Sequence, residues 1–419
     1  MRRGSIGLAV VSFCFLVTLL VVSAEGLCDS VDADLAALVS GNSAFGWTLY
    51  HQTAVDDENV VLSPYSISAA LAMAYAGARG QTKQEMAQVL CHPFEQEDVH
   101  AAFQALGETL GSQDRFFFNP GSDRFILDIA NALWGQEGYG LLATYNSLLE
   151  TYYGAGLNEV DFRSDPEGAR ETINAWVSDE TAAKIPALVP PGVITTDTVL
   201  VLTNAVYLKG AWERPFGEAD TAPGPFTALS GEEKTVPVMH QEGLFYYGGA
   251  GRVQALELRY ENSSLAMMIL LPDAGDFPAI ESAFAPAEVD RLLTSMNWAL
   301  VSLSLPRFSF SSTFYLGEAL TEMGMKSAFS PDADFSGMAG PNPVYLSEVI
   351  HEAFIDVNEK GTEASAATAV IALGGGPMEP PTPVEFTVDR PFLFLMRDKE
   401  TGTILFIGRV TDPTSAGEE

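Results

Sequence analysis

The sequence predicts a single α+β domain, and three observations support this fold class. Helical spacing of apolar residues dominates the first half of the chain, and strand patterns dominate the second half. Helices followed by strands indicate α+β and not alternating βαβ units. After Ala24 no Pro-, Gly- or Ser-rich linker divides the 419 residues. We therefore expect one domain over residues 25–419, with its core at about 35–413.

Helices are expected from the start of this domain. Ser63 followed by Pro64 is typical of an N-cap with proline at the first helical position. Thr82 and Glu85 have the spacing of a capping box. The predicted helices are Asp34–Tyr50, Ser66–Ala76, Thr82–Leu90, Thr144–Tyr152 and Glu167–Thr181.

Strands are expected later. Thr198–Lys209 is apolar and rich in β-branched residues, which predicts a central strand. Near the C-terminus a turn at 398–402 joins two apolar segments and predicts a hairpin. The other predicted strands are Val253–Tyr260, Leu265–Leu271, Leu300–Phe310 and Ser347–Val357, and the hairpin strands are Phe392–Met396 and Ile404–Val410.

The N-terminus has the pattern of a secretory signal peptide. Arg2 and Arg3 precede an apolar stretch from Ile6 to Val22, and small residues end at Ala24. We expect cleavage near Ala24 and an exported protein, with an uncleaved membrane anchor as the alternative. Of the three cysteines, Cys14 leaves with the signal. Cys28 and Cys91 could pair in an oxidising compartment.

Composition narrows the range of functions. Asp and Glu number 55 against 22 Lys and Arg, which gives a formal net charge of −33. This charge repels nucleic acid and anionic lipid, so neither is an expected partner. No Cys/His spacing suggests zinc, and we expect no metal and no cofactor. The sequence lacks a His-Glu-x-x-His motif and a Gly-x-Ser-x-Gly elbow, so an enzyme is not expected.

A segment at residues 360–385 departs from the globular pattern. It separates two strand-like segments, and loops this long are usually functional or disordered. It begins with small residues, and a Gly-rich and Pro-rich part follows from Gly374. As a strand it would place Thr362, Ala364, Ala366, Thr368 and Val370 on one face. This face is small enough to enter a sheet, although composition alone also fits a loose surface linker.

Several motifs here resemble the serpin family, and they occur in the family's order over roughly residues 35–413. The hinge signature of the family is similar to Val357–Thr368. Other segments resemble its early helix motif, its third central strand and its C-terminal hairpin. These segments are Asn59–Ile67 followed by Gly77–Thr82, Leu202–Trp212, and Asp389–Phe394 with Phe406–Val410.

The resemblance implies a fold and a mechanism. The serpin fold packs N-terminal helices on a large central β-sheet, with two further sheets and an exposed reactive-centre loop. An inhibitory member is a suicide substrate, because the protease that cuts the loop forms an acyl-enzyme. The cut loop then inserts into the central sheet and traps the protease. We expect an inhibitory, exported, prokaryotic-type monomer that binds its target covalently.

Roles follow residue by residue from the resemblance. The shutter, a hydrogen-bonded cluster under the point where the sheet opens, is expected at Ser63, Ser66, Asn204 and His351. The breach, where the loop first enters, is expected at Trp212, Arg307 and Glu359, with a salt bridge between the last two. The hinge comprises Glu359, Gly361, Thr362, Ala364, Ala366 and Thr368.

Two ways of counting along the loop place the bond that is cut at different residues. The usual family spacing from Glu359 places it at Gly375–Gly376, whereas counting back from Pro391 places it near Pro380, so this loop is about five residues longer than is typical of the family. Leu373 and Met378 are the alternatives. The segment 362–384 contains no Lys or Arg, which disfavours a trypsin-like target. We expect a serine protease with elastase-, chymotrypsin- or subtilisin-like specificity, with a cysteine protease as the alternative.

The main rival function is a non-inhibitory serpin that acts as a carrier, chaperone or storage protein. Such members usually have bulky or charged residues at hinge positions that must be buried. Thr362, Ala364 and Ala366 are all small, so we favour inhibition. Asn262 begins a glycosylation sequon whose use depends on the host.

Overall fold

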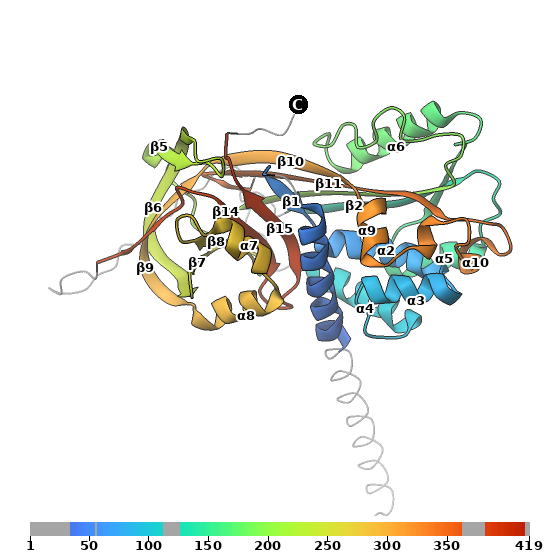
Figure 1. Ribbon diagram of the computed structural model, residues 1–419, viewed down its shortest axis with the longest axis horizontal. Coiled ribbons are helices and arrows are strands. Elements are labelled where there is room, and N and C mark those ends of the chain that lie inside the picture. The colour runs from blue at the N-terminus through green and yellow to red at the C-terminus, as the bar shows by residue number, and fades with distance from the viewer. Residues whose placement is uncertain (1–33, 55–56, 112–125, 363–381, 415–419) are drawn as a thin grey trace, which may run out of the picture.

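A computed structural model describes residues 34–54, 57–111, 126–362 and 382–414, with the backbone alone at 126–128. A six-stranded sheet crosses the molecule, with α6 on one face and the other large helices on the opposite face (Figure 1). Its strands, in spatial order, are β10 (Phe308–Tyr315), β11 (Leu346–Asn358), β12 (Gly361–Thr362), β4 (Leu200–Ala211), β2 (Ile126–Gln136) and β3 (Leu157–Val160).

The two central strands of this sheet, β4 and β11, pair in a different direction from their long neighbours. β4 and β11 run parallel and pair directly from Leu200 to Tyr207. β10 pairs with β11 in the antiparallel sense, and so does β2 with β4. At one end β12 separates the two central strands and pairs antiparallel with both. The sheet is thus already split where residues 361–362 enter it.

The remaining strands form one nine-stranded sheet. The prediction placed them in two further sheets. The 18-residue β6 instead pairs with β5, β7 and β9 and so joins all of these strands into one sheet. Its members are β1 (Val60–Leu62), β15 (Ile404–Val410), β14 (Phe392–Asp398), β8 (Leu265–Pro272), β7 (Val253–Arg259), β6 (Glu233–Ala250), β9 (Asn297–Pro306), β13 (Val384–Thr387) and β5 (Ala222–Thr227).

The helices form around a buried central one. All 14 residues of α2 are buried, and its Ala- and Ser-rich sequence allows close approach from every side. Ser63 caps α2 as predicted, because its side chain accepts a hydrogen bond from the N–H of Ser66. The helices are residues 34–53, α2 (Pro64–Gly77), α3 (Gly80–Val89), α4 (Gln96–Gly111), α5 (Ala143–Tyr153), α6 (Pro166–Glu180), α7 (Phe277–Ala283), α8 (Pro286–Ser295), α9 (Leu316–Met323) and α10 (Ser336–Ala339).

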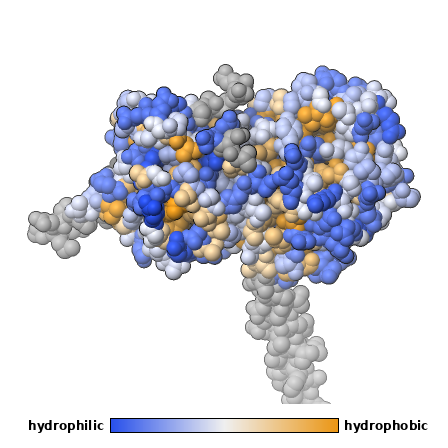
Figure 2. Space-filling model, in the orientation of Figure 1, coloured by the Kyte–Doolittle hydropathy of each residue, from blue (hydrophilic) through white to orange (hydrophobic). Residues whose placement is uncertain are grey.

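No helix within the described ranges is long and apolar enough to span a bilayer. The face shown in Figure 2 is largely hydrophilic, and its apolar residues form small, separate patches. The predicted signal peptide, residues 1–24, lies outside the described residues, and so does Cys28. Cys91 is exposed.

Two local predictions were wrong. Thr82 and Glu85 do not form a capping box, because α3 begins at Gly80 after Arg79. Thr82 Oγ1 instead accepts from the N–H of Asp334 (2.9 Å), and Glu85 from the N–H of Ser327 (2.6 Å). The predicted strand Leu300–Phe310 is two strands, because the chain leaves β9 at Pro306 and begins β10 at Phe308.

The two faces of the central sheet bury separate clusters. Alternate residues of β2 point in opposite directions, as a strand requires. Leu133 packs in the main core, whereas Ala132 and Trp134 pack under α6 with Ile173 and Val177. The same cluster contains Val201 and Ala205 of β4, so α6 covers both β2 and β4 on this face.

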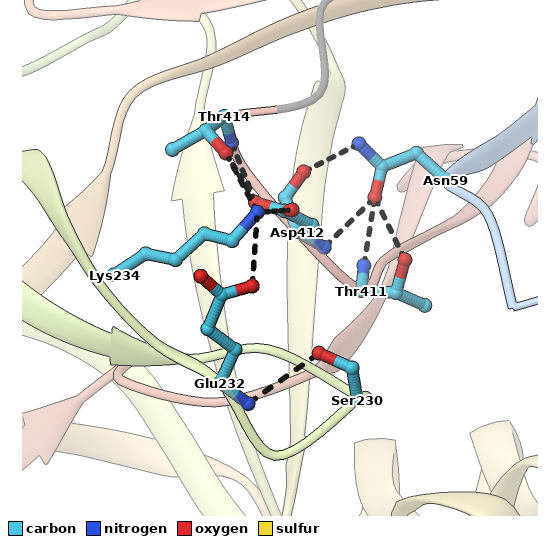
Figure 3. Close-up of polar contacts among 7 residues, drawn as sticks. All are labelled: Asn59, Ser230, Glu232, Lys234, Thr411, Asp412 and Thr414. Carbon is cyan, nitrogen blue, oxygen red and sulfur yellow. Dashed lines mark hydrogen bonds and ion pairs between the residues drawn. The ribbon is translucent and has the colours of Figure 1, made fainter.

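The C-terminal strand is fixed by one asparagine (Figure 3). Asn59 Oδ1 accepts from the N–H groups of Thr411 (2.8 Å) and Asp412 (3.1 Å), and Asn59 Nδ2 donates to the carbonyl of Asp412 (2.7 Å). Asp412 also forms an ion pair with Lys234. These contacts tie the end of β15 to β1 and β6.

Candidate functional site

The strand β12 is held where it enters the central sheet by Trp212. The N–H of Trp212 donates to the carbonyl of Lys360 (2.9 Å), and its indole Nε1 donates to the carbonyl of Asn358 (3.0 Å). Gly361 has φ 155°, and a Cβ there would lie 2.0 Å from the carbonyl oxygen of Gly210. Only glycine allows this close approach.

Thr362 is buried beside two stacked rings. Its Oγ1 lies 2.7 Å from the hydroxyl of Tyr260. The ring of Tyr260 stacks on Trp212 with centroids 4.7 Å apart. Burial raises the pKa of Tyr260, so its hydroxyl stays protonated. Thr362 is thus the first residue of β12 whose side chain is buried in the slot.

Glu359 anchors the segment just before β12. Its carboxylate accepts from Arg307 Nε at 2.7 Å, from Arg307 Nη2 and from the hydroxyl of Thr221. Burial alone would raise the pKa of Glu359, but the hydrogen bonds from Arg307 and Thr221 lower it below its usual value. The predicted ion pair is therefore present, and Arg307 is the residue that links β9 to β10.

The four residues predicted for the shutter lie in one cluster beneath the β4–β11 pair. The N–H of Ser63 donates to His351 Nε2 (3.1 Å), and His351 Nδ1 bonds Asn204 Oδ1. Asn204 Nδ2 bonds Ser66 Oγ and Asn131 Oδ1. The cluster bridges β2, β4, β11 and the N-terminus of α2.

These partners determine the protonation of His351. The N–H of Ser63 is a donor, so Nε2 must accept and the imidazole is neutral with its proton on Nδ1. His351 is fully buried, and this desolvation lowers its pKa to about 3. A proton on Nε2 would remove the acceptor for Ser63 and break the cluster at its centre.

Sequence reasoning missed three residues of this region: Asn131, Thr221 and Tyr260. Asn131 joins the cluster because β2 places it directly opposite Asn204. Only the strand register shows this, and no local motif marks it. The hinge residues Ala364, Ala366 and Thr368 lie outside the described residues. So do the candidate cleavage positions Leu373, Gly375, Gly376 and Met378.

Comparison with known proteins shows the family to which this fold belongs. The family model for Serpin (serine protease inhibitor) matches residues 40–413.

The chain belongs to the serpin family.

An uncharacterized serpin-like protein of Thermococcus kodakarensis is 40% identical to this serpin over 376 residues, which cover 90% of this chain and 86% of the relative. The leukocyte elastase inhibitor of Bos taurus is 38% identical over 368 residues, which cover 85% of this chain and 93% of the relative. The structure of thyroxine-binding globulin in complex with thyroxine superposes with a TM-score of 0.79 at 29% identity. It covers 90% of this chain and 99% of the globulin.

These relatives include protease inhibitors and a globulin that binds thyroxine. Membership therefore establishes the fold of this serpin, and it does not by itself distinguish an inhibitor from a carrier.

Proposed function

We propose that this serpin inhibits serine proteases, with cysteine proteases as a second possible class, by inserting its cut loop between β4 and β11. One observation carries the proposal. Gly361 and Thr362 already lie between these strands as an antiparallel strand, at the start of the segment that resembles the family hinge. Insertion would extend a strand that is already in place.

The pairing of the sheet supplies a driving force. β4 and β11 are a parallel pair, and parallel pairing is slightly less stable per residue than antiparallel pairing. A strand continuing from Thr362 would replace one parallel ladder with two antiparallel ladders. The uncut protein cannot reach this state, so its persistence is kinetic.

Continuing the register of β12 predicts where each hinge residue would go. Thr362 pairs with Val357 and Gly210, so Ala366 would lie between Ala353 and Val206. The small side chain of Ala366 would then face the main core, in which Ala353 and Val206 are fully buried. An alanine fits this position without displacing either strand.

The same register carries Thr368 to the shutter cluster. Thr368 would lie between His351 and Asn204, which pair directly in the described structure. Its hydroxyl can both donate and accept, so it could join the hydrogen bonds there. Insertion would therefore separate the two residues and replace their contact with new bonds to the loop.

The bond to be cut and the target stay as predicted from the sequence. We place the cut at Gly375–Gly376, with Leu373 and Met378 as alternatives, and expect an elastase-, chymotrypsin- or subtilisin-like enzyme. The acyl-enzyme ester makes the complex covalent. From the N-terminal pattern we infer that the protein is exported, and we propose that it acts as a monomer.

A panel of proteases tests the proposal. The serpin is incubated with elastase, chymotrypsin, subtilisin and trypsin, and the products are separated on a denaturing gel. We expect a gel-stable complex with at least one of the first three enzymes and none with trypsin. Mass spectrometry of the released peptide then locates the cut. Loop cleavage by all of them, with each enzyme left active, would reject inhibition and favour the carrier alternative.

A further inference from the structure

A cavity of about 380 Å³ lies where three connections of the nine-stranded sheet meet. The β5–β6 turn, the β8–α7 connection with the start of α7, and the β13–β14 connection form its walls. None of its lining residues belongs to β12 or to the shutter cluster. A cavity of this size can hold a small molecule, so it is a candidate site separate from the one described above.

Hydrogen bonds hold the walls of this cavity in place. The N–H of Thr227 donates to the carbonyl of Asp389 (2.8 Å), and the N–H of Leu229 donates to the carbonyl of Thr411 (3.1 Å). Thr411 is in turn held by Asn59, as Figure 3 shows. The cavity is therefore formed before a ligand binds, and little conformational entropy is lost on binding.

The walls are largely apolar. Leu229, Pro278 and Pro391 come from the three connections in turn, and Phe277 lines the cavity next to Pro278. Phe277 is 4% exposed and packs in the main core, so its ring is fixed. Proline side chains have no rotamer freedom to lose on binding. Such walls favour a ligand with an apolar body, because the hydrophobic effect drives that body out of water.

Arg390 supplies a fixed polar group to the cavity. Its Nε donates to the carbonyl of Pro272 (2.9 Å), and its Nη1 donates to Asp389 Oδ1 (2.6 Å). These two bonds fix the plane of the guanidinium. No described residue accepts a hydrogen bond from Nη2. A ligand with an acceptor at this nitrogen would gain a charge-assisted hydrogen bond to a donor that is already in place.

The charge of the walls narrows the choice of ligand. Among the described residues, the charged side chains that line the cavity are Asp273, Asp389 and Arg390. Each carboxylate has an arginine partner, Arg252 for Asp273 (3.7 Å) and Arg390 for Asp389, so no positive charge is left over to attract an anion. The net charge of −33 repels an anion further. An ammonium group can only donate, so it offers Arg390 no acceptor.

We propose that this cavity binds a small apolar molecule that carries a neutral carbonyl group, as an amide or a ketone does. The apolar body lies against Leu229, Pro278 and Pro391, and the carbonyl oxygen accepts from Arg390 Nη2. The site shares no residue with the proposed inhibition, so either proposal can fail without the other.

A matched set of ligands tests the chemical class. Binding of naphthylacetamide, naphthylacetone, anionic naphthylacetate and cationic naphthylethylammonium is measured by calorimetry. We expect the two neutral carbonyl compounds to bind at least about tenfold more tightly than either charged compound. Equal or tighter binding of a charged compound would overturn the proposal, and so would the absence of measurable binding by both neutral compounds.

A pair of variants locates the site. Ala274 lines the cavity, and Ala274→Phe should fill part of it and reduce affinity for naphthylacetone more than about tenfold. Ala279→Phe is the control, because Ala279 is exposed on α7 and does not line the cavity. Wild-type affinity in the Ala274→Phe protein would reject this location.

A second pair of variants tests the donor. Arg390→Lys keeps the positive charge but removes the planar fork, so affinity for naphthylacetone should fall about tenfold. Methylnaphthalene has no acceptor, and its affinity should stay unchanged. Arg252→Lys is the matched control, because Arg252 is exposed and does not line the cavity. Equal losses for both ligands in Arg390→Lys would overturn the role given to Arg390 and the proposal with it.

The C-terminal residues 415–419 follow Thr414 and lie outside the described residues. A protein that ends at Thr414 tests whether they compete with the ligand. We expect its affinity for naphthylacetone to equal that of the full chain. A gain of more than about tenfold would mean that the chain fills its own cavity, and this result would overturn the proposal.

Discussion

His351 is the buried group whose charge matters most to the shutter cluster. Its ordinary pKa is about 6.5 and its folded pKa is about 3. Between these values the unfolded chain binds a proton that the folded protein does not, so the free energy of unfolding falls as the pH falls. From about pH 7.5 to about pH 5 the loss should be about 2 kcal/mol for this residue.

The acid sensitivity can be measured by thermal unfolding of wild type and His351→Gln. Burial also lowers the pKa of His92 to about 3 and that of His100 to about 4, so both add to the wild-type loss, whereas burial raises the pKa of Glu352 to about 7, which offsets part of it. Glutamine does not titrate, so the loss between the two pH values should be about 2 kcal/mol smaller in His351→Gln than in wild type. The same shift in both proteins would mean that His351 is not neutral in the fold.

Glu359 provides a second prediction at the level of residues. Glu359→Ala should destabilise the protein by about 1–3 kcal/mol, because it leaves Arg307 and Thr221 without their acceptor. Glu288→Ala removes an exposed pair with Arg291 and should change stability by less than about 1 kcal/mol. Unfolding midpoints of both variants make the comparison. Equal effects would show that Glu359 is no anchor.

At the level of elements, the insertion of the loop depends on which face of the strand each residue occupies. Ala366→Arg would place a charged side chain against Val206 and Ala353, and burying an unpaired charge is costly. We expect the number of serpin molecules used per protease inhibited to rise more than about tenfold. The variant would still be cleaved, now as a substrate.

The control for this variant is Thr382→Arg. Thr382 is exposed and lies after the segment expected to insert. Its arginine should leave inhibition unchanged, although it adds the same charge within the segment 360–385. Inhibition by Ala366→Arg equal to wild type would contradict insertion in this register.

The elements that could be predicted from sequence are those with local signals. The cap at Ser63-Pro64 and the apolar strand β4 were both recognised, because proline at a helix start and β-branched runs act within a few residues. β6 was missed, since Pro237 and three glycines interrupt its pattern. The split at Arg307 was missed although the buried apolar positions change phase there, from Leu303 and Leu305 in β9 to Phe308 and Phe310 in β10.

The residues of the candidate site also fall into two groups, those that a sequence motif marks and those that it does not. The family motifs indicated Ser63, Asn204 and His351, and the structure places them together. Asn131 and Tyr260 act through tertiary contacts, the first by facing Asn204 and the second by stacking on Trp212. Neither residue has a neighbour in sequence that marks it.

For the whole molecule, the proposal predicts a large gain in stability after the loop is cut. Thermolysin is suitable, because a metalloprotease forms no acyl-enzyme and is not trapped. A cut loop inserted between β4 and β11 replaces one parallel ladder with two antiparallel ladders, and the unfolding midpoint should rise by more than about 10 °C. Circular dichroism of intact and cut protein measures it. An unchanged midpoint would show that the sheet does not expand.

Gly361 constrains how this protein can vary through evolution. Its backbone conformation excludes most side chains. The atom nearest to an added Cβ is the main-chain oxygen of Gly210, which a substitution at position 210 would not remove. A library randomised at residue 361 and selected for folded protein should therefore return glycine almost alone. Other residues should be tolerated at position 361 only in proteins whose β4 has shifted away from it. An inherited substitution of Gly361 must therefore accompany a change in β4.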